Sequence, residues 1–158
     1  MTKHKVLPTV VLLIFVSTIS LGQIKNDEYL QTGWYYVNVD NSGVKRFSEN
    51  DSANYYINPA PIVTLINFSE VYLDKNVMGN NIIVIKLDEN GKLLWENATF
   101  KWVMRKVAFV YKNKVVSIGK VLEKIESGIT TIYIKGEPLD LLNKLKNNID
   151  QEIKDLKH

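Results

Sequence analysis

In the second half of the chain, apolar runs that are typical of strands alternate with stretches in which apolar residues recur at helical spacing. Residues 82–87 are almost continuously apolar, which is typical of a central strand that is covered on both faces. In the stretch that follows, apolar residues recur every three to four positions, so we predict a helix that packs on a sheet. The stripe consists of Leu94, Trp95, Ala98, Thr99, Trp102 and Val103. We expect Asn90 to cap the start of this helix.

Three more strands and a second helix are predicted downstream. Residues 107–111 and a strand starting at Lys114 form a hairpin, because asparagine in the intervening turn tolerates left-handed geometry. Residues 129–134 form a strand, and Pro138 suits the first turn of a helix. Apolar residues at helical spacing then follow: Leu142, Leu145, Ile149, Ile153 and Leu156. The order β-α-β-β-β-α predicts an α+β fold with the helices on one face of a mainly antiparallel sheet.

The region before residue 82 has the composition of strands. The candidate strands are residues 34–39, 44–47, 55–57 and 62–68. The turn signal at residues 40–43 predicts that the first two form a hairpin. Pro59 and Pro61 remove backbone donors and are expected to end the third strand. We therefore predict a β-rich N-terminal extension over residues 23–81, packed on an α+β domain of residues 82–158.

Residues 1–22 have the organisation of a secretory signal peptide. Basic residues precede the apolar run of residues 10–16, and Ser20-Leu21-Gly22 supplies small residues at the spacing that signal peptidase needs. We predict cleavage between Gly22 and Gln23. The alternative is an uncleaved membrane anchor, but the apolar run is shorter than the roughly 20 residues that span a bilayer. The mature protein is then exported, either to the periplasm or out of the cell.

Charge and composition exclude several classes of function. The net charge is +3, and loss of Lys3 and Lys5 with the signal leaves +1, too little for a nucleic-acid-binding surface. The chain has no cysteine and would keep only His158, which argues against thiolate, zinc and Ser-His-acid chemistry. Asp88 and Glu89 are adjacent and point apart, unlike the facing acids of a glycan hydrolase. We expect no enzyme activity, cofactor or metal, and a hydrolase is the weakest alternative.

Two sets of residues are candidate partner-binding sites. Leu93, Phe100 and Met104 form a second apolar strip on the first helix. This strip either packs under the N-terminal extension or lies exposed as a contact patch. Tyr55 and Tyr56 belong to an aromatic set that either lines a platform for a peptide or glycan or packs as ordinary strand residues.

The motifs from residue 87 onward resemble those of a known family. They are Leu87-Asp88-Glu89-Asn90-Gly91, Thr99-x-x-x-Val103, Lys106-Val107-Ala108-Phe109-Val110 and Lys114-Val115-Val116-Ser117. They are similar to the head subdomain of the first periplasmic domain of SecD/SecDF, an accessory of bacterial protein export. Met104 stands where the family pattern has glycine. Since methionine does not adopt positive φ cheaply, we expect the helix to end differently or to run longer.

The resemblance implies a fold and a compartment, and a function only by analogy. After the signal the chain has no apolar run of membrane-spanning length, so it resembles a head without the membrane helices. We expect a non-enzymatic cell-envelope protein that contacts extended or unfolded polypeptide, by strand addition at a sheet edge. The alternative is a structural or assembly protein that self-associates or docks a larger envelope partner.

Overall fold

The computed structural model describes residues 28–157, and the predicted signal peptide with its cleavage site at Gly22 and Gln23 lies outside them. The elements are β1 (Gly33–Asn38), β2 (Val44–Ser48), β3 (Ala53–Thr64), the 3-10 helix η1 (Leu65–Asn67), β4 (Phe68–Lys75), β5 (Asn81–Leu87), α1 (Glu89–Lys101), β6 (Lys106–Tyr111), β7 (Lys114–Lys120), β8 (Ile129–Ile132) and α2 (Leu139–Lys157). The predicted α+β class and the order β-α-β-β-β-α from residue 82 are confirmed.

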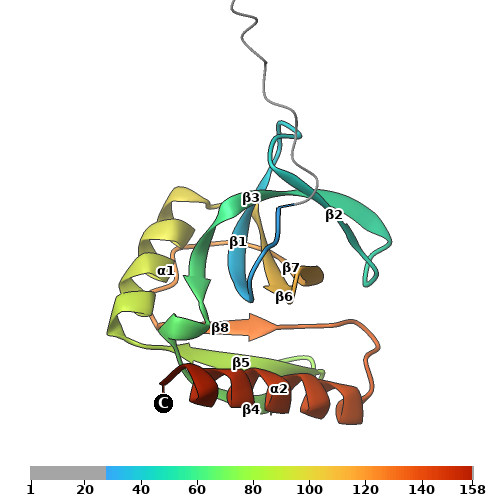
Figure 1. Cartoon of the computed structure of the whole chain (residues 1–158), viewed down its shortest axis with the longest axis vertical. Coiled ribbons are helices and arrows are strands. Elements are labelled where there is room, and N and C mark those ends of the chain that lie inside the picture. Colours follow the sequence, from blue (N-terminus) through green and yellow to red (C-terminus); the bar gives the residue numbers. More distant parts are fainter. Residues whose placement is uncertain (1–27, 158) are drawn as a thin grey trace, which may run out of the picture.

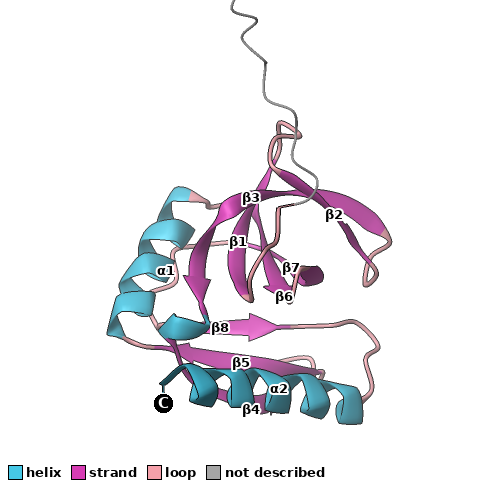
Figure 2. Ribbon diagram, viewed as in Figure 1, coloured by secondary structure: helices cyan, strands magenta, loops and turns pink. Residues whose placement is uncertain are grey.

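The strands divide between two sheets, whereas the order of elements suggested one (Figure 1). A closed barrel has the order β1-β3-β2-β7-β6, and β4, β5 and β8 form a separate antiparallel sheet (Figure 2). Strands from the two sides of residue 82 pair with each other, β1 with β6 and β4 with β5. The boundary between the N-terminal extension and the α+β domain at residue 82 stays a prediction. Strands of these two segments are neighbours in both sheets.

The larger core cluster contains residues of the barrel, the three-stranded sheet and both helices. Its centre is aromatic, because the Trp34 ring centroid lies 5.4 Å from that of Trp95 and 5.3 Å from that of Phe109. α2 packs on β4 and β5 (Figure 1), and β5 is almost entirely buried, as expected for a central strand. A second, smaller cluster includes Tyr35 and Ile57 and contains only barrel strands and the segment before them.

Three predictions about the first strands are wrong. β1 and β2 do not form a hairpin, because β3 lies between them and pairs with both. β3 continues through Pro59 and Pro61 as one strand of 12 residues. Pro59 lies where the β1–β3 register shifts, and such an irregularity tolerates a missing backbone donor. Residues 62–68 are not one strand, since η1 separates β3 from β4.

The start of α1 is set by Asp88 rather than by the expected cap, Asn90. The Asp88 Oδ1 accepts a hydrogen bond from the Gly91 N–H at 2.7 Å. Gly91 packs closely on η1, where an added Cβ would lie 2.8 Å from the Asn67 Cβ. The acid and the glycine of the turn motif therefore have separate tasks, one in capping and one in close packing.

The buried face of α1 is narrower than the predicted stripe. Trp95, Ala98 and Thr99 are buried, but Leu94 and Val103 are exposed. α1 therefore leaves apolar side chains in contact with solvent.

The end of α1 overturns the expectation for Met104, which adopts left-handed backbone geometry with φ of 67°. Trp102 is the C-terminal cap. The Met104 N–H donates to the Val121 carbonyl at 2.7 Å, and the Val121 N–H donates to the Arg105 carbonyl at 2.9 Å. These bonds hold a methionine in a conformation that favours glycine.

Candidate functional site

The predicted strip is exposed to solvent, but only Leu93 and Phe100 lie on α1, because that helix ends at Lys101 and Met104 belongs to the turn after it. Leu93, Phe100 and Met104 are 58%, 66% and 61% exposed, and no part of residues 28–81 covers them. Beside the strip, the Trp102 ring packs on Tyr36 with centroids 4.5 Å apart. The strip is therefore available for contact with a partner.

Tyr55 and Tyr56 are half-buried on β3, and as consecutive strand residues they point to opposite faces. The Tyr55 hydroxyl donates to Asp51, and the Lys106 Nζ lies 5.1 Å from the Tyr55 ring centroid. Burial, together with the bond to Asp51, raises the pKa of Tyr55 to about 12. Burial also acts to raise the pKa of Asp51, but the hydrogen bond from Tyr55, together with the nearby charge of Lys106, outweighs it and lowers that pKa. The two tyrosines do not form one platform.

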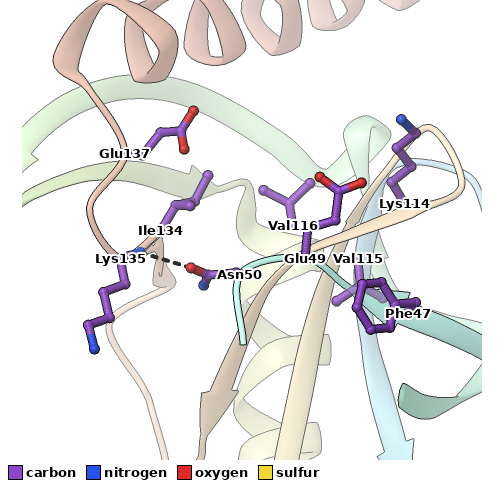
Figure 3. A pocket seen from close by; sticks show the side chains of 9 residues that line it. All are labelled: Phe47, Glu49, Asn50, Lys114, Val115, Val116, Ile134, Lys135 and Glu137. Atoms are coloured by element: carbon purple, nitrogen blue, oxygen red, sulfur yellow. Dashed lines mark hydrogen bonds between the residues drawn. The ribbon is translucent and has the colours of Figure 1, made fainter. Parts of the chain in front are cut away.

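A pocket of about 490 Å³ lies between β2, β7 and the loop after β8 (Figure 3). Its lining residues are Phe47, Glu49, Asn50, Lys114, Val115, Val116, Ile134, Lys135 and Glu137. Two acids and two lysines balance the charge around an apolar lining. The Lys135 N–H donates to the Asn50 Oδ1 at 3.1 Å, which ties the β2–β3 turn to the loop opposite.

β7 presents Val116 to this pocket through a β-bulge. β6 and β7 form the predicted hairpin, and its turn residues Lys112 and Asn113 both have positive φ. The register shifts between Phe109 and Val110, which leaves Val116 without a partner on β6. A bulge re-aims the side chain of the extra residue, and Figure 3 shows Val116 among the lining residues.

Sequence reasoning did not single out this pocket. Its residues come from three segments that only the fold brings together, and none has an unusual local pattern. The one available signal was the motif at residues 114–117, which supported the family resemblance and includes three of the lining residues.

The two acids considered for a hydrolase, Asp88 and Glu89, both lie at the start of α1. The carboxylate of Asp88 caps α1, and Glu89 is exposed in the first turn of that helix. Across residues 28–157, no cluster of three or more histidine, cysteine, aspartate or glutamate side chains could hold a metal ion. In the same range, no helix has both the length and the apolar character needed to cross a membrane.

Comparison with known families identifies this combination of elements. The family model described as "SecDF, P1 head subdomain" matches residues 36–139, which is about two thirds of the chain. The chain belongs to the SecDF P1 head family. The resemblance inferred from the motifs is confirmed, and the match begins within the predicted N-terminal extension. No curated protein matches the chain.

Two solved structures share the fold of this SecDF P1 head protein. A structure of SecDF, described as a membrane component that enhances protein export, aligns with a TM-score of 0.59 and 12% identity, over 77% of this chain and 62% of that one. A crystal structure of SecDF in the super-membrane-facing form aligns with a TM-score of 0.54 and 11% identity, over 66% and 16% of the two chains. The chain thus spans less than two thirds of either protein.

Proposed function

We propose that this protein is an exported, non-enzymatic member of the cell envelope that binds extended or unfolded polypeptide. Membership of the SecDF P1 head family supports a link to protein export, and the signal-like residues 1–22 support a location outside the cytoplasm. The site, rather than the fold, has to supply the reason for polypeptide as the ligand.

The pocket beside β7 is the observation on which this proposal depends. Phe47, Val116 and Ile134 offer apolar surface to side chains of a ligand. The surrounding acids and lysines are balanced in number, so they suit a ligand that has both donors and acceptors and little net charge. An extended polypeptide has these properties, because it exposes backbone amides together with side chains that a folded protein would bury.

A fluorescence anisotropy titration tests the proposal. The probe is a labelled secretory polypeptide that is kept unfolded by substitution, and the control is the same polypeptide in its native fold. We expect saturable binding of the unfolded form, with a Kd of about 1–100 μM, and no binding of the folded control. Absence of saturation at high micromolar protein would contradict the proposal.

Self-association through the α1 strip is the second candidate, because Leu93 and Phe100 on α1 and Met104 in the turn after it are all exposed. Light scattering of the purified protein over a range of concentrations separates the two functions. A concentration-independent monomer that binds unfolded polypeptide supports the first. A stable oligomer that is indifferent to polypeptide and dissociates in Phe100→Ser supports the second.

A further inference from the structure

One edge of β7 is only partly occupied by another strand of the described chain. β6 pairs with β7 from Lys114 to Lys120. On the other side, the β2 register contains a single pair, Ser48 with Val115, after which β2 ends. Among residues 28–157, β7 therefore has an open edge from Val116 to Lys120, directly beside the pocket.

The hydrogen bonds to β6 identify which backbone groups face the open edge. The Val121 N–H donates to the Arg105 carbonyl, so Val121 faces β6. Inter-strand bonds of an antiparallel ladder occur at every second residue. Ser117 and Gly119 therefore also face β6, whereas Ile118 and Lys120 direct their N–H and C=O groups to the open side. No loop or cap within the described range bonds to these outward groups.

The open edge of β7 is less protected than the edge of β4. On β4, Glu70 and Asp74 are exposed, and the Lys157 Nζ donates to the Phe68 carbonyl at 2.8 Å. On the open edge of β7, residues 116–119 have no charged side chain, and the exposed Lys120 is the single charge at its end. Unprotected backbone groups on a strand edge are a template for pairing with another extended chain.

The face of the sheet beside this edge is also open at Gly119. An added Cβ on Gly119 would have a single near neighbour, Cγ2 of Val107, at 3.9 Å. A glycine within a strand permits another backbone to approach closely. The edge therefore combines unpaired backbone groups, an uncrowded sheet face at Gly119 and an adjacent pocket.

We propose that an extended polypeptide segment adds to β7 as a further strand. Its backbone pairs with the outward groups of Ile118 and Lys120, and one of its side chains enters the pocket at Val116. The paired stretch, residues 116–120, is about 17 Å long. This inference rests on the proposed function and adds to it the binding mode and the strand that binds.

A second copy of the same chain fits this edge less well than a foreign segment. Antiparallel pairing of two β7 strands centred on Ser117 would bring Lys114 of one copy close to Lys120 of the other, at both ends. Like charges on facing strands are destabilising. A segment with apolar residues at alternate positions and acidic residues at its ends avoids this repulsion.

Amide hydrogen exchange measured by NMR tests the binding mode at single-residue level. The probe is the unfolded polypeptide of the anisotropy titration, added to the full chain. At 95% saturation we expect exchange of the Ile118 and Lys120 amides to slow about twentyfold, because only the free fraction exchanges. The amides of Ser117 and Gly119, which already bond to β6, are the internal control and change much less.

Two variants of one residue supply an independent test. Lys120→Pro removes an outward N–H without removing a bond to β6, and we expect it to weaken binding about tenfold. Lys120→Ala is the matched control for the lost charge and should weaken binding less than about threefold. Equal effects of the two variants would overturn the inference.

The outcomes separate this inference from the proposed function. Saturable binding that protects other residues and leaves Ile118 and Lys120 unchanged overturns strand addition at β7 but keeps a polypeptide-binding function. No saturable binding overturns both. Protection of the same two amides by raising the concentration of the protein alone would assign the edge to a second copy and overturn the inference.

Discussion

Replacing Met104 by glycine is predicted to stabilise the protein, although it removes a large side chain. Met104 has a φ of 67°, in the left-handed region where a Cβ meets the following carbonyl. The conformation is enforced by the backbone bond from its N–H to the Val121 carbonyl, so the residue cannot relax without breaking the connection between α1 and β6. The side chain is 61% exposed and contributes little to packing.

The magnitude follows from two opposing effects. Left-handed geometry costs a residue with a Cβ about 1–2 kcal/mol relative to glycine. Glycine in turn loses more backbone freedom on folding, which costs about 0.5–1 kcal/mol. The net gain in the free energy of unfolding is therefore about 0.5–1 kcal/mol, or roughly 2–5 °C in Tm for a domain of this size.

Chemical denaturation of the wild type, Met104→Gly and Met104→Ala measures this gain. Alanine has the same exposed position and keeps the Cβ, so we expect no stabilisation from Met104→Ala. If glycine and alanine change the free energy of unfolding equally, the gain does not come from backbone geometry. If glycine destabilises the protein, the left-handed turn at the end of α1 is contradicted.

Three further predictions concern single side chains. Asp88→Ala should lower the free energy of unfolding by about 1 kcal/mol through loss of the α1 cap, and Asp88→Asn should keep most of it; equal losses in denaturation would argue against the cap. Gly91→Ala should cost on the order of 1–3 kcal/mol despite the better helix propensity of alanine, because the new Cβ would lie 2.8 Å from the Asn67 Cβ; a thermal melt that shifts upward would contradict that contact. The pKa of Tyr55 is about 12, above its ordinary value, so the contribution of its hydroxyl to stability is present below pH 10 and is lost as the pH rises from 10 to 12. In an ultraviolet titration of tyrosine ionisation, Tyr55→Phe should remove absorbance that develops near pH 12. If the substitution removes absorbance that develops near pH 10 instead, the raised pKa of Tyr55 is refuted.

The parts of the fold that could be predicted are those that local patterns decide. The periodicity of α2 and the turn at Lys112 and Asn113 depend on residues close together in the chain, and both are observed. The buried run of β5 likewise follows from its own composition. In each of these three cases, the residues that determine the structure lie within one element or one turn.

The barrel could not be predicted, because its closure depends on pairing between distant segments. Pro59 and Pro61 signalled the end of a strand, but the irregular register between β1 and β3 accommodates them. The position of Met104 shows the same conflict, since tertiary bonds to residue 121 override its local preference.

Only part of the candidate site was accessible from sequence. The apolar strip of α1 was recognised by its spacing, and it is exposed. The pocket was not, because its apolar lining comes from Phe47, Val116 and Ile134, which lie far apart in the chain. The bulge that turns Val116 toward the pocket arises from the pairing of β7 with β6, which no single-strand pattern encodes.

The affinity of two charge-matched variants for unfolded polypeptide tests the central claim most directly. Val116→Arg places a cation in the pocket beside β7, and Phe100→Arg places the same cation on the α1 strip, with circular dichroism to verify that both variants are folded. If polypeptide binds along β7, Val116→Arg raises the Kd about tenfold or more while Phe100→Arg stays within about twofold of the wild type. The opposite order, or equal affinities for all three proteins, would contradict the assignment of binding to β7.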